Sequence, residues 1–191
     1  MIDDADHHVC PWQHGALLTV GARKLLNNPV RIVTPYLSPG ATAMDVGCGM
    51  GFFTIPMARI VGPSGRVVAV DLQPEMLAGL EKNAAKADCG NIAVHQCGAR
   101  SLGVGQWDGA VDFVLVFYML HEVPDPQRLV GEVCAVLKPG GALLFAEPSG
   151  HVNGREFEQE ATLFAQAGLA EVDRPRILTS RAVVWRKAGI A

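Results

Sequence analysis

From residue 41 onward, short and continuously apolar runs alternate with segments of helical periodicity. The apolar runs are predicted strands, and most of them lack the apolar–polar alternation of a strand with one face in water. A strand that is apolar on both sides must be covered on both faces, as in a parallel sheet between two layers of helices. The pattern therefore predicts an α/β fold, a Rossmann-like doubly wound sheet with helices on both faces.

Seven strands and four helices are expected after residue 40. The predicted strands are 41–46, 65–72, 91–96, 111–120, 142–148, 169–175 and 180–188. The predicted helices are 52–61, 74–87, 155–168 and one that starts at 126 and is closed by Lys138-Pro139-Gly140. Because no helix separates the last two strands, we expect an antiparallel edge in a mostly parallel sheet. Residues 1–40, with a helical pattern at 20–37, are expected to form an N-terminal lid segment beside the domain at 41–191.

Length and composition limit the class of protein. A chain of 191 residues can bury one full core, and no apolar run reaches the roughly 18 residues of a membrane-spanning helix. The five cysteines are scattered and never spaced CxxC, as expected for reduced thiols. Together with an acidic start unlike a signal peptide, these features predict a cytoplasmic protein. The net charge of −3 argues against a nucleic-acid partner, and whether the chain forms a homodimer stays open.

A glycine-rich loop follows the first predicted strand, with Gly47, Gly49 and Gly51 at alternate positions. Such spacing permits a tight turn and lets a ligand lie against backbone N–H groups at the start of a helix. By itself the loop is equally explained as a tight strand-to-helix connection. The GxGxxG fingerprint of dinucleotide enzymes would place glycine at Phe52, which argues against a nicotinamide oxidoreductase.

The second predicted strand ends near Asp71, 22 residues after Gly49. A carboxylate at this point can accept hydrogen bonds from both hydroxyls of a ribose. A turn acid ahead of Pro74 is the simpler explanation of Asp71 taken alone. The combination of this acid with the glycine loop favours a cofactor that contains a ribose.

Four segments of the chain resemble, in order, motifs of the class I S-adenosylmethionine-dependent methyltransferases. They are AMDVGCGMGFFT, VVAVDLQPEML, VDFVLVFYMLHEVPD and LKPGGALLFAEP. The resemblance implies that S-adenosylmethionine is the cofactor, and it is not specific for a substrate. It implies cofactor contacts at Asp45, Gly47, Gly49 and Gly51 for the methionine part, Asp71 for the ribose, Leu72 for the adenine, and Phe117 at the end of the fourth strand.

The loop after the third strand departs from the family pattern. In the family it commonly carries an acidic residue that contacts the adenine amino group, whereas this chain has Cys97-Gly98-Ala99. Adenine recognition is then left to backbone groups near Gly98 and Ala99, or to the side chain of Gln96.

Methyl transfer is an in-line displacement that depends on alignment in a dry pocket, and some acceptors also need a base. The catalytic candidates are Tyr118 and His121, which follow the fourth strand. His121 is expected to act as a base or to orient the acceptor, and a capping role in its loop is the alternative. Glu147, beyond the fifth strand, is expected to line the acceptor pocket, with a plain loop role as its alternative.

The residues that follow the fourth predicted strand lack the motifs of DNA-methylating enzymes, which narrows the class of methyl acceptor. The exit of that strand has no Asp/Asn-Pro-Pro-aromatic run and no cysteine nucleophile, as DNA-methylating enzymes would require, so we expect a small-molecule acceptor. Arsenic-methylating relatives use several pocket cysteines in a pattern that this chain does not match, and LHEVPD loosely resembles quinone-precursor methyltransferases. A non-catalytic protein that binds S-adenosylmethionine or S-adenosylhomocysteine and acts through a partner is the alternative function.

The opening stretch HHVCPWQH, residues 7–14, has the composition of a lid. Trp12 would shield the methyl group from water, and His8, Cys10 and His14 would offer polar edges to the acceptor. An arm that packs an aromatic side chain on the core is the alternative. Because His-x-Cys-x3-His is not a standard metal spacing and lacks a fourth ligand, no metal site is predicted.

Overall fold

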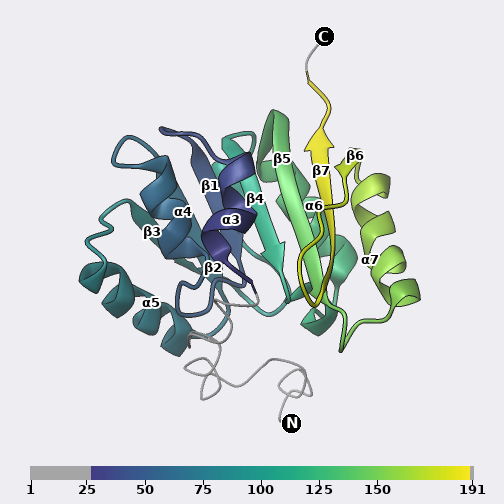
Figure 1. Cartoon of the computed structure of the whole chain (residues 1–191), viewed down its shortest axis with the longest axis horizontal. Coiled ribbons are helices and arrows are strands. Elements are labelled where there is room, and N and C mark those ends of the chain that lie inside the picture. The colour runs from purple at the N-terminus through teal and green to yellow at the C-terminus, as the bar shows by residue number, and fades with distance from the viewer. Residues whose placement is uncertain (1–26, 190–191) are drawn as a thin grey trace.

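The computed structural model describes residues 27–189. One sheet runs through the centre of the molecule, with helices packed against it (Figure 1), and its strand order is β3-β2-β1-β4-β5-β7-β6. The strands are β1 (Thr42–Val46), β2 (Arg66–Asp71), β3 (Ile92–Gln96), β4 (Val111–Phe117), β5 (Leu137–Pro148), β6 (Leu169–Asp173) and β7 (Ser180–Lys187). The predicted seven-stranded, doubly wound sheet is confirmed.

The first five strands are parallel to one another, and β7 runs antiparallel between β5 and β6. The expected antiparallel C-terminal edge is therefore also confirmed. The chain reverses its direction of travel across the sheet between β1 and β4, which lie side by side. Open α/β sheets bind ligands beyond the carboxyl ends of the strands at such a switch point.

Two layers of helices cover the two faces of the sheet. The helices are α3 (Pro29–Val33), η3 (Thr34–Tyr36), α4 (Thr54–Val61), α5 (Pro74–Lys86), η4 (Gly105–Trp107), η5 (Leu120–Glu122), α6 (Pro126–Val136) and α7 (Gly154–Gln166). Residues of α3 and α4 share one apolar core with one face of the strands, and α5 packs beside them. Residues of α6 and α7 share the core on the opposite face. Because helices cover both faces of the sheet, the central strands are apolar on both sides.

Two predicted element ends differ in the structure. The fourth strand stops at Phe117 instead of residue 120, because Tyr118 has a left-handed backbone with φ of 63° that turns the chain into η5. The helix predicted from residue 126, which is α6, ends at Val136, and β5 begins at Leu137. Lys138-Pro139-Gly140 therefore lies in the first part of β5 and does not close the helix.

The described part of the predicted helix at 20–37 consists of two short helical pieces. The Asn28 side chain accepts a hydrogen bond from the backbone N–H of Arg31, and Pro29 occupies the first turn of α3. A second proline lies in η3, whose Tyr36 stacks on Phe113 of β4 at 5.6 Å between ring centroids. Residues 20–26 lie outside the described range, and the proposed boundary at residue 40 stays a prediction.

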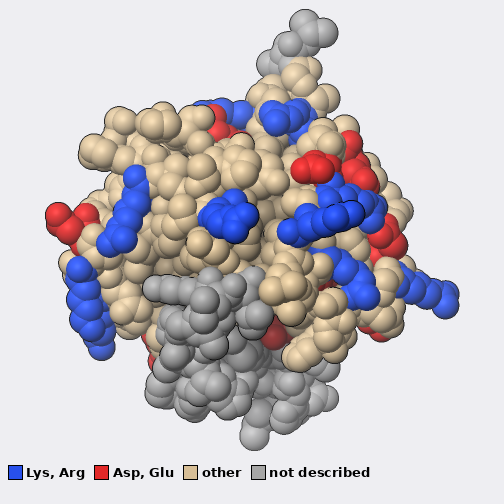
Figure 2. Space-filling model, viewed as in Figure 1, with Lys and Arg blue, Asp and Glu red and all other residues tan. Residues whose placement is uncertain are grey.

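The distribution of charge on the surface and the length of the helices bear on possible partners. Lys and Arg side chains on the face in Figure 2 form scattered groups separated by uncharged surface. Within residues 27–189, every helix is too short or too polar to cross a membrane.

Gly51 generates the first testable prediction. Its φ is 94°, and a Cβ there would lie 2.5 Å from Cδ1 of Leu80 in α5. The Gly51→Ala variant is therefore expected to lose about 1–3 kcal/mol of unfolding free energy, from steric overlap and a strained backbone. Gly131, inside α6, has no neighbour within 4 Å of such a Cβ. The Gly131→Ala control is expected to gain about 0.5–1 kcal/mol. Urea unfolding followed by circular dichroism measures both, and a neutral Gly51→Ala would contradict this account of α5 packing.

Candidate active site

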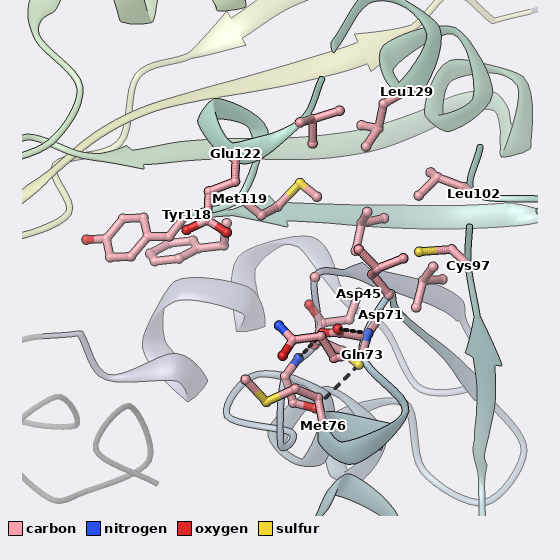
Figure 3. Close-up of a pocket in the computed structure, with 18 of the residues that line it drawn as sticks. Asp45, Asp71, Gln73, Met76, Cys97, Leu102, Tyr118, Met119, Glu122 and Leu129 are labelled. Carbon is pink, nitrogen blue, oxygen red and sulfur yellow. Dashed lines mark hydrogen bonds between the residues drawn. The ribbon is translucent and has the colours of Figure 1, made fainter. Parts of the chain in front are cut away.

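A cavity of about 360 Å³ opens at the carboxyl ends of the central strands (Figure 3). It is lined by the loops that follow β1, β2, β3 and β4, together with residues from the start of α5 and α6. The predicted cofactor residues that line it are Asp45, Gly47, Gly49, Asp71, Leu72, Gly98, Ala99 and Phe117. The position agrees with the switch point of the sheet.

Asp71 fixes the glycine loop at the end of β2. Its Oδ2 accepts a hydrogen bond from the backbone N–H of Gly49 at 2.8 Å, and its Oδ1 accepts one from Gln73 at 3.0 Å. Burial raises the pKa of the Asp71 carboxyl, and these N–H donors partly oppose that shift. A carboxylate has about four acceptor positions, so Asp71 can also receive donors from the cavity. Asp71, Gln73 and Asp45 lie together on one side of the cavity in Figure 3.

Asp45 and Gly47 form the base of the loop after β1. Asp45 is buried, and its Oδ2 accepts a hydrogen bond from the Thr54 hydroxyl at 2.6 Å, which ties β1 to the start of α4. Gly47 has φ of 76°, and a Cβ there would lie 3.0 Å from the side chain of Met119. A larger residue at 47 would therefore push apart the loops that follow β1 and β4.

Gly51 differs from the other predicted cofactor residues, because it is not among the residues that line the cavity. It faces Leu80 of α5 and Ile55 of α4 instead. Its missing side chain lets these two helices approach the loop. Gly51 therefore has a packing role in this structure, and its expected cofactor contact stays a prediction.

The wall beside Asp71 is mainly apolar. Met76, Leu102 and Leu129 line the cavity together with Leu72. The first three were missed by the sequence analysis, because an apolar residue on a helix or loop has the same pattern whether it faces a core or a ligand. Figure 3 shows Leu102 and Leu129 on the side of the cavity away from Gln73.

Polar groups at the end of β3 and in the loop after it form hydrogen bonds with nearby backbone carbonyls. The N–H of Gly98 donates to the Ser101 carbonyl at 2.9 Å. The Gln96 side chain donates to the Leu72 carbonyl at 3.3 Å, and Gln96 is not among the cavity-lining residues. Of the three groups proposed for adenine recognition, Gly98 and Ala99 border the cavity and Gln96 does not.

Glu147 occupies a different place from the one expected. It is 0% exposed and does not line the cavity, because it lies beneath the turn that follows β4. Its Oε1 accepts hydrogen bonds from the backbone N–H groups of Leu120 at 2.8 Å and His121 at 3.2 Å. Its Oε2 lies 2.7 Å from Nδ1 of His121. Glu147 therefore orients His121 from outside the cavity lining.

His121 borders the cavity with a fixed imidazole. Because the buried Glu147 carboxylate acts as an acceptor, Nδ1 is the protonated nitrogen and Nε2 is the one that exchanges a proton. The hydrogen bond to Glu147 raises the pKa of His121, against the opposing effect of burial. Nε2 lies 3.9 Å from Oε1 of Glu122, and the ring of His151, which also lines the cavity, is 6.3 Å from that of His121. His121 can therefore hold or release a proton at the cavity wall.

Tyr118 contributes its ring to the cavity wall. Its hydroxyl is hydrogen-bonded to Oγ of Ser180 and accepts a bond from the Asn27 side chain at 3.2 Å. In Figure 3 this hydroxyl points away from Asp45 and Asp71. The Tyr118 ring packs on Phe117 at 4.3 Å between centroids. The catalytic role of Tyr118 stays a prediction.

The cavity also contains two cysteines. Burial raises the pKa of Cys48 and raises that of Cys97 to about 11, so both are protonated thiols at neutral pH. Within residues 27–189, no three His, Cys, Asp or Glu side chains could together hold a metal ion. The lid candidates His8, Cys10, Trp12 and His14 lie outside the described residues.

Comparisons with known proteins identify the family of the chain. A family model described as a methyltransferase domain matches residues 37–179. The arsenite methyltransferase of Halobacterium salinarum is 33% identical over 111 residues, which cover 58% of this chain and 28% of that protein. The demethylmenaquinone methyltransferase of Shouchella clausii is 34% identical over 110 residues, 58% of this chain and 46% of that protein. The chain thus spans less than half the length of these curated relatives.

A solved structure shows the same fold over nearly the whole chain. The crystal structure of an S-adenosylmethionine-dependent methyltransferase from Aquifex aeolicus has a TM-score of 0.83 at 22% identity. The match covers 93% of this chain and 99% of that one. Family and fold together imply S-adenosylmethionine as the cofactor.

Asp71 generates the second prediction. The Asp71→Ala variant is expected to bind S-adenosylhomocysteine on the order of 100-fold more weakly, because two charge-assisted hydrogen bonds to the ribose are lost. Isothermal titration calorimetry measures the affinity, and circular dichroism shows whether the variant is folded. Asp108→Ala, at an exposed position after η4, is the control and is expected to bind normally. Unchanged affinity in a folded Asp71→Ala protein would contradict the ribose assignment.

Proposed function

Because the chain belongs to the methyltransferase domain family, we propose that it transfers a methyl group from S-adenosylmethionine to a small molecule that loses a proton on methylation. One observation carries this proposal. The same cavity is bordered by the glycine loop with Asp71 and by His121, whose imidazole is oriented by a buried carboxylate. The residues proposed for the cofactor and the proposed base thus border one cavity.

The residues on the cofactor side fit S-adenosylmethionine. The Asp71 carboxylate faces the cavity with acceptor capacity for ribose hydroxyls, and Leu72, Met76 and Leu102 supply an apolar wall suited to an adenine ring. Asp45 and Gly47 would hold the methionine part. When bound, the cofactor supplies a methyl group on a positively charged sulfur.

On the acceptor side, His121 would act as the base, and apolar residues after β4 would shield the reaction from water. Nε2 of His121 would take the proton that the acceptor loses, and the Glu147 carboxylate would stabilise the resulting imidazolium through Nδ1. The two backbone bonds to Glu147 keep the ring from rotating out of the wall. Phe117, Tyr118 and Met119 border the cavity, and their apolar surface would help to keep water away from the transferred methyl group.

A hydroxylated aromatic acceptor, such as a quinol, suits this site better than arsenite. Methylation of a quinol at carbon or oxygen releases a proton, which His121 can accept. Arsenite would need thiolates for its capture, whereas burial raises the pKa of Cys48 and Cys97. Of the acceptors that the two relatives' names suggest, we therefore propose the quinone-related class.

The direct test is transfer of radiolabelled methyl from S-adenosylmethionine to a panel of hydroquinones, catechols and arsenite. Label on a hydroxylated aromatic compound is the expected result. Label on arsenite alone would overturn the acceptor class. Binding of S-adenosylhomocysteine without transfer to any acceptor would favour the alternative, a non-catalytic cofactor-binding protein that acts through a partner.

Several further features remain proposals. We propose that residues 1–40 act as a lid in which Trp12, His8 and His14 face the acceptor. A cytoplasmic location and the absence of a nucleic-acid partner stay predictions from the sequence, and the homodimer stays an open question.

The third prediction concerns the pH dependence of transfer. Because only the neutral imidazole accepts a proton, kcat/KM is expected to rise with pH through the pKa of His121, which Glu147 holds above its ordinary value of about 6.5. In Glu147→Gln the principal cause of that shift is gone, so the midpoint is expected at lower pH. His121→Ala is expected to lose about 100-fold or more in rate.

Rates measured between pH 5 and 9, with Glu81→Gln on the exposed face of α5 as control, test this prediction. A midpoint that Glu147→Gln leaves in place would show that His121 is not the titrating base.

A further inference from the structure

Two side chains from different elements hold the backbone of Leu102, which lies in the loop between β3 and η4. Oε2 of Glu132 in α6 accepts hydrogen bonds from the N–H groups of Leu102 at 2.7 Å and Gly103 at 3.1 Å. Nε2 of His95 in β3 lies 2.7 Å from the Leu102 carbonyl oxygen. Because a carbonyl oxygen can only accept, Nε2 is the protonated nitrogen of His95. Leu102 is therefore held at both its backbone donor and its backbone acceptor.

These two contacts fix where the side chain of Leu102 lies. Leu102 is 4% exposed and lines the cavity. Leu129, which precedes Glu132 by three residues in α6, also lines the cavity, and this spacing places the two side chains of α6 close together. Figure 3 shows Leu102 and Leu129 on the same side of the cavity. One turn of α6 thus supplies part of the cavity wall and the carboxylate that holds the neighbouring part.

The other groups of this loop offer little polar contact to a ligand. Residues 97–102 all line the cavity and include no Asp or Glu. The Gly98 N–H donates to the Ser101 carbonyl at 2.9 Å, and Oγ of Ser101 accepts from the Gly103 N–H at 3.1 Å. Burial raises the pKa of Cys97 to about 11, so its thiol is neutral. A planar base on this side meets mainly apolar contacts, which weaken sharply when surfaces separate by less than about 1 Å.

We propose that Glu132 and His95 are positioning residues for the cofactor, which through Leu102 fix the apolar wall against which its base packs. This inference rests on the proposed placement of the cofactor in the cavity, with its ribose on Asp71. Glu132 and His95 are not among the residues that line the cavity, so both act through Leu102. Two polar side chains thereby determine how tightly the base is bound without touching it.

The first test measures S-adenosylhomocysteine binding by calorimetry, with circular dichroism to show that each variant is folded. Glu132→Ala and His95→Ala each remove a partner of Leu102 and are expected to bind on the order of 10-fold more weakly. Glu132→Gln keeps an oxygen that can accept both N–H groups, so it is expected to restore the affinity. Wild-type affinity in folded Glu132→Ala or His95→Ala protein would overturn the proposal.

Arg128→Ala is the matched control in the same helix. It removes the ion pair between Arg128 and Glu132, in which the Arg128 side chain is 56% exposed, and leaves the Glu132 carboxylate in place. Because an exposed ion pair contributes little, this variant is expected to bind S-adenosylhomocysteine normally. A loss equal to that of Glu132→Ala would assign the effect to the ion pair and overturn the role of Leu102.

The second test separates the base wall from the rest of the site. S-ribosylhomocysteine has the ribose and the amino-acid part of the ligand but no base, and its binding is followed by NMR titration of the full chain. Glu132→Ala is expected to bind it as the wild type does, because no base reaches Leu102. An equal loss of affinity for both ligands would show a general disturbance of the site and would overturn the proposal.

The third test asks whether Glu132 acts through Leu102. Leu102→Ala is expected to weaken S-adenosylhomocysteine binding, and adding Glu132→Ala to it is expected to cause little further loss. Fully additive losses would overturn the proposal.

A measurement on the wild-type chain needs no variant. Amide hydrogen exchange of Leu102 is expected to slow when S-adenosylhomocysteine is bound and to stay unchanged with S-ribosylhomocysteine. An equal response to both ligands would contradict the proposal. All of these tests measure binding, whereas the proposed function is tested by methyl transfer, so failure of one can be told from failure of the other.

Discussion

The buried carboxylate of Glu147 is the interaction on which the acceptor side of the site depends. It collects two backbone N–H groups of the turn after β4 and the imidazole of His121. Each buried donor that lost its partner would cost about 1–3 kcal/mol, so the turn and the ring are held in one arrangement. The left-handed residue Tyr118 brings the chain back over the end of β5 and makes this contact geometrically available.

Asp71 has the matching role on the cofactor side. It binds the N–H groups of Gly49 and Gln73 and so fixes the loop after β1 against the end of β2. Parallel strands place all their carboxyl ends at one edge of the sheet, which is why Asp71, which borders the cavity, and Glu147, which lies beneath the turn that carries His121, are found at the same edge. The scaffold thus supplies rigid walls, and each wall is held by a carboxylate whose own geometry is fixed by backbone donors.

The features that could be predicted from the sequence are those with a local or periodic signal. The continuously apolar runs indicated a parallel sheet, and the glycine loop with Asp71 indicated the binding edge. Other features depend on contacts between distant residues. The packing role of Gly51 is set by Leu80, and the burial of Glu147 by the turn at Leu120 and His121.

The cavity unites these observations, because Asp71 and His121 both border it. A crystal structure of the full chain with S-adenosylhomocysteine tests this account most directly. We expect the ligand in the cavity beneath the glycine loop, with its ribose hydroxyls on the Asp71 carboxylate and its sulfur end toward His121. A ligand bound elsewhere, or bound in the cavity without contact to Asp71, would contradict the assignment of the site.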